Sequence, residues 1–119
     1  MNSVLFVSHD ADLRAVASRV LMSAGFRVTA AAHAGHVTLA CMTGTFDVLV
    51  VERRMADGTS EAVADRFQRH NPQANIVWIG DEKVEGPGHP GVARPFDAYD
   101  LIGAVSDATH YARRLATNL

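Results

Sequence analysis

The chain has 119 residues, of which 48% are hydrophobic and 20% charged, and its formal net charge is −2. This composition is unlike that of a disordered chain, and the weak net charge disfavours tight non-specific binding of nucleic acid or of an anionic membrane. The length predicts one domain over residues 1–119, and the lone cysteine excludes an internal disulfide and any multi-cysteine zinc site.

The amino terminus lacks the features of a targeting segment. Its first ten residues, MNSVLFVSHD, contain no basic region followed by a long apolar stretch. No apolar run approaches the roughly 20 residues that cross a bilayer. We therefore expect a cytoplasmic protein with no membrane partner.

Five short apolar runs are predicted to be strands. Their apolarity is continuous rather than alternating, which is typical of strands covered on both faces in a parallel α/β sheet. In chain order they are VLFV at 4–7, RVTAAA at 27–32, VLVV at 48–51, IVWI at 76–79 and the weaker GVA at 91–93.

Helical patterns separate these runs. They span residues 11–25, 34–44, 60–72 and 97–119. Asp10 or Ser8 is predicted to cap the first helix, which Gly25 ends, and Ser60 to cap the third. The apolar faces are predicted to consist of Leu13, Val16, Val20, Leu21, Val37, Leu39, Ala40, Cys41, Val63, Phe67, Leu101, Ile102, Val105, Ala108, Ala112 and Leu115.

The repeated strand and helix order predicts a doubly wound α/β sheet with helices on both faces. Residues 81–93 break this order, because five of these thirteen residues are Gly or Pro, which disfavours a regular helix. Trp78 is predicted to lie in the core, and Met42 and Met55 to fill gaps in it.

In open α/β sheets the functional crevice lies at the carboxyl ends of the strands. The residues predicted to lie there are Ser8, His9, Asp10, Glu52, Gly80, Asp81, Arg94 and Pro95. Glu52 is followed at once by Arg53 and Arg54. The predicted site is therefore built around one carboxylate with arginines close to it in the sequence.

The chain resembles the receiver domain of bacterial response regulators, the chemotaxis-type fold, from about Ser3 to Leu115. The segments that carry the resemblance are VLFVSHDADLR, GFRVTAAAHAGHVTLA, FDVLVVERRMADGTS, NIVWIG and ARPFDAYDL. It implies a receiver/flavodoxin-like, five-stranded parallel sheet in the order 2-1-3-4-5. The Gly/Pro-rich segment implies that the family's helix 4 is shortened or replaced by a loop.

Receivers of this family transfer a phosphoryl group from a histidine kinase to an aspartate, with the help of Mg²⁺. The resemblance places their acidic pair at Ser8 and His9, the phospho-acceptor at Glu52, a hydroxyl residue at Gly80 and a lysine at Arg94. All five positions are altered, and we interpret them as a degenerate phosphorylation site.

Each alteration has a chemical consequence. Mg²⁺ prefers oxygen ligands, usually with more than one carboxylate in such a site, whereas Ser8 and His9 supply a hydroxyl and an imidazole. An acceptor one methylene longer moves the nucleophilic oxygen by about an ångström, which can cost on the order of 10²-fold in rate. Gly80 lacks the hydroxyl that would bind a phosphoryl oxygen, and the planar Arg94 does not replace a lysine. We expect no metal site, no Mg²⁺ cofactor and no enzymatic activity.

The predicted function is that of a phosphorylation-independent pseudo-receiver, a regulatory protein-interaction module of bacterial two-component signal transduction. Its predicted partners are proteins of a signalling pathway rather than nucleic acid, and a homodimer is common enough in this fold to be a fair expectation. We also hypothesise that Glu52 pairs with Arg94 and holds one conformation; a solvated strand-end carboxylate is the alternative.

Three other functions remain open from the sequence. The first is a receiver with residual phosphotransfer. The second is a small-ligand sensor that binds a cyclic dinucleotide through Arg53 and Arg54. The third, less favoured, is a transition-metal site made by His9, Asp10 and Glu52.

Overall fold

The computed structural model describes residues 2–53, 60–80, 91–93 and 97–117. Strands and helices alternate along the chain as predicted. The elements are β1 (Ser3–Val7), α1 (Ala11–Ser23), β2 (Arg27–Ala31), α2 (Ala34–Thr43), β3 (Val48–Glu52), α3 (Ser60–His70), β4 (Asn75–Gly80), β5 (Gly91–Ala93) and α4 (Ala98–Thr117).

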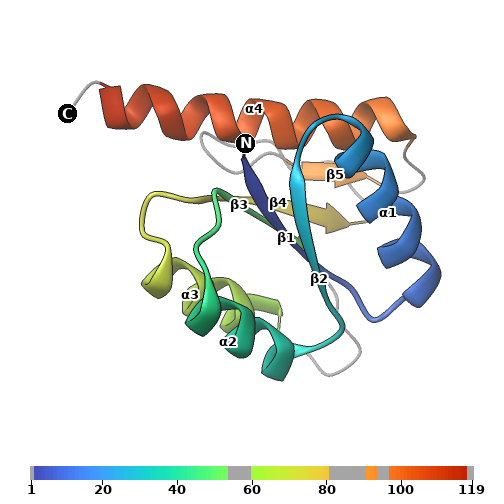
Figure 1. The fold of residues 1–119 in the computed structure, drawn as a ribbon, viewed down its shortest axis with the longest axis horizontal. Helices are drawn as coiled ribbons and strands as arrows, with labels where there is room; N and C mark the ends of the chain where they lie inside the picture. The colour runs from blue at the N-terminus through green and yellow to red at the C-terminus, as the bar shows by residue number, and fades with distance from the viewer. Residues whose placement is uncertain (1, 54–59, 81–90, 94–96, 118–119) are drawn as a thin grey trace.

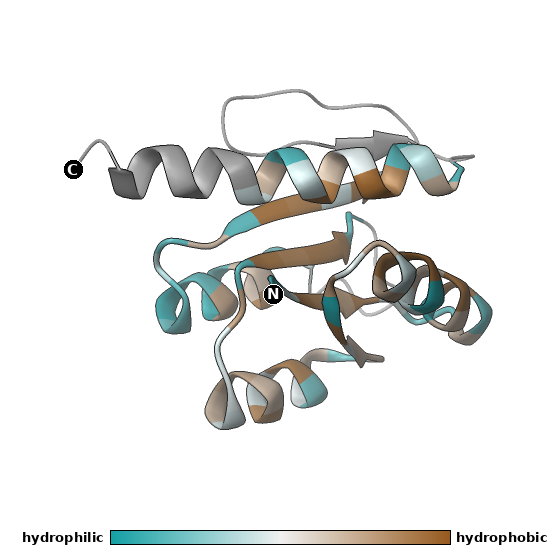
Figure 2. Cartoon of the chain, turned by 45° about the horizontal axis from the view of Figure 1, so that its top comes forward, coloured by the Kyte–Doolittle hydropathy of each residue, from teal (hydrophilic) through white to brown (hydrophobic). Residues whose placement is uncertain are grey.

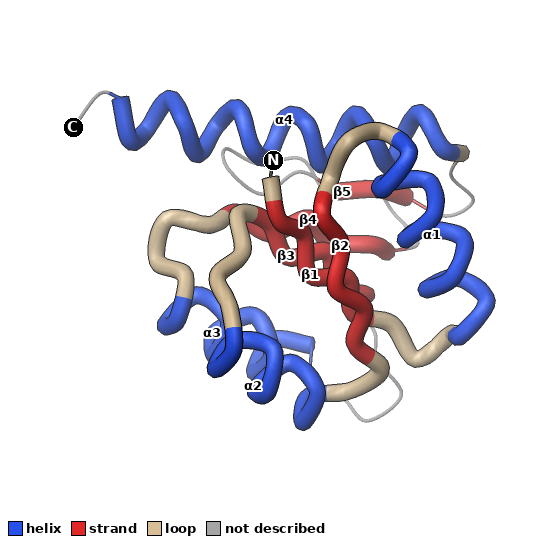
Figure 3. The backbone as a smooth tube through the Cα atoms, in the orientation of Figure 1, coloured by secondary structure: helices blue, strands red, loops and turns tan. Residues whose placement is uncertain are grey.

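The strands form one parallel sheet in the order β2-β1-β3-β4-β5. The predicted order of the first four strands is confirmed, and the three-residue β5 pairs with β4. Helices α1 and α4 lie on one face of the sheet and α2 and α3 on the other (Figures 1 and 3). Residues 81–90, the predicted site of the shortened helix, lie outside the described residues.

The core consists of two apolar layers, one on each face of the sheet. Successive residues of β1 alternate between them: Val4 and Phe6 pack with α1 and α4, and Leu5 and Val7 pack with α2 and α3. Because both faces are covered there, the central strands β1 and β3 are almost entirely apolar, as Figure 2 shows, whereas the edge strand β2 is largely exposed. This explains the continuous apolar runs in the sequence.

Helix α1 is bounded by two sequence signals. The Asp10 carboxylate accepts hydrogen bonds from the amides of Asp12 and Leu13, which confirms Asp10 as the N-cap. At the other end, Gly25 has φ 96°, and the amide of Phe26 donates to the Leu21 carbonyl. This backbone reversal is a Schellman motif, and its positive φ favours glycine.

Three apolar side chains predicted to face the core are instead exposed. Val16 is 57%, Leu39 62% and Met42 71% exposed. The predicted apolar faces were too wide. In α1 the buried side is centred on Ala17 and Leu21, and Val16 points away from it. In α2 the buried residues are Val37 and Cys41, and Leu39 lies on the opposite side of the helix because it is two residues from Val37.

Helix α4 is held against the sheet by apolar and polar contacts. Leu101, Val105 and Ala108 are buried as predicted. The side-chain amide of Asn75, at the start of β4, donates to the Ala108 carbonyl at 2.8 Å. None of the described helices is long and apolar enough to cross a membrane.

A buried asparagine joins three segments at the opposite end of the sheet from the predicted site. Asn71 accepts a hydrogen bond from the Phe46 amide at 2.8 Å and donates to the Phe67 carbonyl at 3.2 Å. Its amide also lies 4.0 Å from the sulfur of Cys41. Burial raises the pKa of the Cys41 thiol, and the contact with Asn71 partly opposes that shift.

The Gly25 turn can be tested with a pair of glycine substitutions. A Cβ at either Gly25 or Gly103 meets no atom within 4 Å, so packing contributes little to either change. Gly25→Ala should lower the free energy of unfolding by about 1–2 kcal/mol, because alanine is disfavoured at positive φ. Gly103→Ala, inside α4, should raise it by about 1 kcal/mol. Urea unfolding measures both, and the same sign for the two changes would contradict this account.

Candidate functional site

The carboxyl edge of the sheet brings Ser8 and Glu52 together. Val7 of β1 is paired with Val51 of β3, so the residues that follow them are neighbours. Ser8 is fully buried and Glu52 is 8% exposed. The Ser8 hydroxyl donates a hydrogen bond to Oε1 of Glu52 at 2.9 Å. Two of the predicted site positions therefore form one buried, hydrogen-bonded pair.

Ser8 also connects this pair to α1. Its hydroxyl oxygen accepts a hydrogen bond from the Asp10 amide at 3.0 Å, and Asp10 caps the helix. From the first turn of α1, the Arg14 guanidinium donates to the Ser8 carbonyl at 2.7 Å. An unbroken series of hydrogen bonds thus runs from the Glu52 carboxylate to the start of α1.

The backbone of Glu52 is anchored as well. Its carbonyl accepts a hydrogen bond from the Ser60 hydroxyl at 2.7 Å, and Ser60 is the first residue of α3. Ser60 was predicted as the residue before the helix, so the observed boundary differs by one position. Glu52 is also aligned with Ile79 of β4, which places it at the centre of the edge.

Arg53 lies at the same edge but is directed at an aromatic ring. Its amide donates to the Ile79 carbonyl at 2.7 Å, and its guanidinium carbon lies 4.9 Å from the centre of the Trp78 ring. This cation–π contact gives the exposed Arg53 side chain a defined position. Trp78 is half-buried, so the prediction that it belongs to the core is confirmed only in part.

The remaining predicted site residues are only partly placed. His9 is exposed, next to Ser8, and Gly80 ends β4. Four predicted positions lie outside the described residues: Arg54, Asp81, Arg94 and Pro95. The Glu52–Arg94 pair therefore stays a prediction.

The described part of the chain contains no cluster of metal-binding side chains that would support the transition-metal alternative. Within it, no group of three His, Cys, Asp or Glu side chains is placed to hold a metal ion. His9, Asp10 and Glu52 are all described, and the Glu52 carboxylate instead receives the Ser8 hydroxyl. The arrangement thus favours a fixed, hydrogen-bonded carboxylate over a transition-metal centre at these three residues.

The sequence predicted that Ser8 and Glu52 lie at one edge of the sheet, but it missed two contacts there. Ser8 was interpreted as a lost acidic ligand, and its bond to Glu52 depends on the β1–β3 register, which sequence patterns do not fix. Arg14 was not identified, because an arginine in a helix carries no signal for a carbonyl six residues earlier.

We predict that Ser8→Ala destabilises the fold. The change leaves the Asp10 amide without its acceptor and the Glu52 carboxylate without this donor, which should lower the free energy of unfolding by about 1–3 kcal/mol. Ser23→Ala is the matched control, because it removes an exposed hydroxyl bonded to a helix carbonyl and should change stability by less than about 0.5 kcal/mol. Equal effects of the two changes in urea unfolding would show that the Ser8 bonds contribute nothing.

Comparison with known proteins places this geometry in a known fold. No protein-family model and no curated protein matches the sequence. Among solved structures, a response regulator receiver protein from Sinorhizobium medicae WSM419 superposes with a TM-score of 0.81 and 24% identity, covering 93% of this chain and 96% of that one. The chemotaxis response regulator CheY4 of Vibrio cholerae gives 0.77 and 21%, covering 91% and 98%.

A third structure is the response regulator TrrA from Thermotoga maritima in complex with Mg(2+)-BeF. Its TM-score is 0.74 and its identity 15%, covering 91% of this chain and 99% of that one. Identities this low establish the fold and nothing beyond it. On that ground the chain adopts the α/β fold of response-regulator receiver domains.

Proposed function

We propose that the protein is a pseudo-receiver, a regulatory protein-interaction module of bacterial signal transduction that works without phosphorylation. The observation that carries the proposal is the buried hydrogen bond from Ser8 to Glu52. These two residues stand at positions where the resemblance places an acidic metal ligand and the phospho-acceptor. A hydroxyl thus donates to a carboxylate at the place where a working receiver would accept a phosphoryl group.

The surroundings of Glu52 support a structural rather than a nucleophilic role. Attack on a phosphoryl group needs an accessible oxygen aligned with the phosphorus. Glu52 is 8% exposed, and one of its oxygens already accepts the Ser8 hydroxyl. A carboxylate that is buried and hydrogen-bonded in this way is a poor nucleophile, although it suits a fixed charge.

The donor set also supports the loss of Mg²⁺. Ser8 directs its proton at Glu52 and accepts the Asp10 amide, so its oxygen is engaged on both sides. His9 offers an imidazole, which Mg²⁺ disfavours. The TrrA structure contains Mg(2+)-BeF, and we propose that this chain does not bind that pair of ligands.

The hydrogen bonds around Ser8 suggest how one conformation is kept. They tie the acceptor position on β3 to the capped start of α1, and the Ser60 hydroxyl ties the same residue to α3. In a receiver with this network the carboxylate at the acceptor position is already hydrogen-bonded, and we propose that no Mg²⁺ binds beside it. We propose that the chain presents one surface to a protein partner at all times.

Loss of phosphotransfer can be tested by mass spectrometry and fluorescence. With acetyl phosphate and Mg²⁺, the native chain should give no phosphoryl adduct in its intact mass. Titration with Mg²⁺ alone should leave the emission of Trp78, the one tryptophan, without a saturable change. A chain in which the family's residues are restored, by Ser8→Asp, His9→Asp, Glu52→Asp, Gly80→Thr and Arg94→Lys, serves as the positive control. An adduct on the native chain would instead support residual phosphotransfer.

The role of the pair in partner binding can be tested with two variants that separate charge from hydrogen bonding. Glu52→Gln keeps an oxygen that accepts the Ser8 hydroxyl but removes the charge, whereas Ser8→Ala keeps the charge and removes the bond. A partner recovered from the native host should bind the Ser8→Ala chain about tenfold more weakly, equivalent to 1.4 kcal/mol. If binding is unchanged in both variants, the pair does not control the partner surface.

A further inference from the structure

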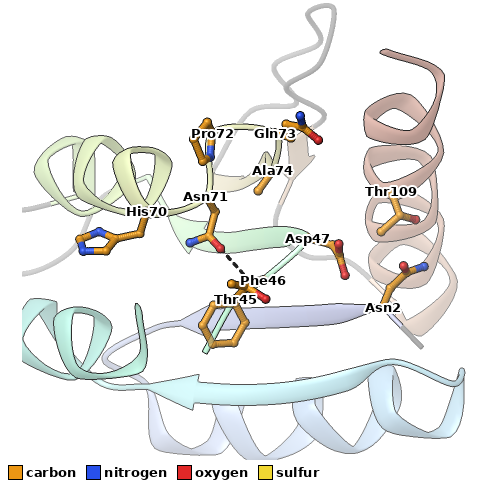
Figure 4. A pocket seen from close by; sticks show the side chains of 10 residues that line it. All are labelled: Asn2, Thr45, Phe46, Asp47, His70, Asn71, Pro72, Gln73, Ala74 and Thr109. Atoms are coloured by element: carbon orange, nitrogen blue, oxygen red, sulfur yellow. Dashed lines mark hydrogen bonds between the residues drawn. The ribbon is translucent and has the colours of Figure 1, made fainter. Parts of the chain in front are cut away.

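A hollow lies at the amino edge of the sheet, opposite the Ser8–Glu52 pair. It has a volume of about 410 Å³ and is bordered by the segment before β3, the turn between α3 and β4, and Thr109 of α4 (Figure 4). Binding sites for small molecules commonly have volumes of roughly 300–1,000 Å³. No sequence motif marks it, and the proposed function does not use it.

The wall of this hollow is rigid. Asn71 is buried, and it joins the Phe46 amide to the Phe67 carbonyl through its side chain. On the other side, Thr109 is 4% exposed, and its hydroxyl donates to the Ser106 carbonyl at 2.8 Å. The walls are therefore pre-formed, which lowers the entropic cost of binding.

The described part of the lining carries one carboxylate. Asp47 is the only acidic side chain among the described lining residues, and none of these is a lysine or an arginine. Oδ2 of Asp47 accepts the Ser3 amide at 2.8 Å, while Oδ1 has no hydrogen-bond donor among the described residues. Helices α2 and α3 both end at this edge, and the carboxyl end of a helix carries a partial negative charge of about −0.5.

His70 also lines the hollow. Its Nδ1 lies 3.0 Å from the Arg66 carbonyl, and because a carbonyl can only accept, Nδ1 is the donor. Figure 4 shows the His70 ring directed away from Asp47. Among the described lining residues, a ligand at Asp47 would meet oxygen acceptors, including those of the exposed Thr45 and Gln73.

From these observations we infer that the amino-edge hollow binds a small organic ammonium compound. The ammonium group donates to Oδ1 of Asp47 and to neighbouring neutral oxygens, and the alkyl part packs against Phe46 and Pro72. Phosphates and carboxylates are disfavoured by the Asp47 carboxylate, because none of the described lining residues is an arginine or a lysine. This inference is independent of the pseudo-receiver proposal, since it concerns the other edge of the sheet.

The adjoining hollow provides a contrast. It has a volume of about 320 Å³, shares Thr45 and Phe46 with the first, and is lined by Arg27 from β2. Its cation repels an ammonium group. Binding should therefore be confined to the side of Phe46 that carries Asp47.

The experiment is a titration of the ¹⁵N-labelled chain with 1,4-diaminobutane at constant ionic strength, followed by amide chemical shifts. We expect saturable shifts at Phe46, Asp47 and Gln73, and no such response to 1,4-butanediol, which has similar size but no charge. Asp47→Asn should weaken binding by about two- to fivefold. The variant keeps an oxygen for the Ser3 amide, and a thermal melt checks that it folds.

Asp65→Asn is the matched control, because Asp65 is an exposed carboxylate on α3 that does not line the hollow. It should bind the diamine as the native chain does. Equal weakening by the two variants, shifts that do not saturate, or an equal response to the diol would each overturn the inference. The comparison of diamine with diol uses the native chain and so holds even where Asp47→Asn fails to fold.

Discussion

The parallel register of β1 against β3 determines that the side chains of Ser8 and Glu52 meet. It aligns Val7 with Val51, and the next residues, Ser8 and Glu52, therefore meet at the edge of the sheet. A slip of one residue would exchange the two faces of β1. The side chains that now pack with α1 and α4 would then face α2 and α3, and the reverse. The geometry of the Ser8–Glu52 pair is thus maintained by the strand register and by the core packed around it.

The Ser8–Glu52 pair also changes the electrostatics of the fold. The resemblance implies that a working receiver gathers several carboxylates at this edge, where like charges repel each other and raise the energy of the metal-free state. Here a hydroxyl takes one of these positions and donates to the remaining carboxylate. At this pair of positions a hydrogen bond therefore takes the place of a repulsion between two carboxylates.

The sequence predicted the parts of the fold that depend on local signals. Continuous apolar runs marked the strands, Asp10 marked the start of α1 and Gly25 its end. It failed where burial depends on how a helix is rotated against the sheet, as at Val16 and Leu39. It also gave the residue types of the site without their contacts, because the Ser8 hydrogen bonds depend on strand register and on the path of a long arginine side chain.

The length of α4 affects how the molecule moves in solution. At 1.5 Å per residue its twenty residues span about 30 Å, against a longest molecular extent of 38 Å, and in Figure 1 the helix lies along that axis. The molecule is therefore elongated, at 38 × 30 × 26 Å, and its rotational diffusion is anisotropic. The backbone N–H bonds of α4 point along the long axis of the molecule, and the direction of this axis changes slowly. The transverse relaxation of the α4 amide nitrogens is therefore fast even in a rigid helix.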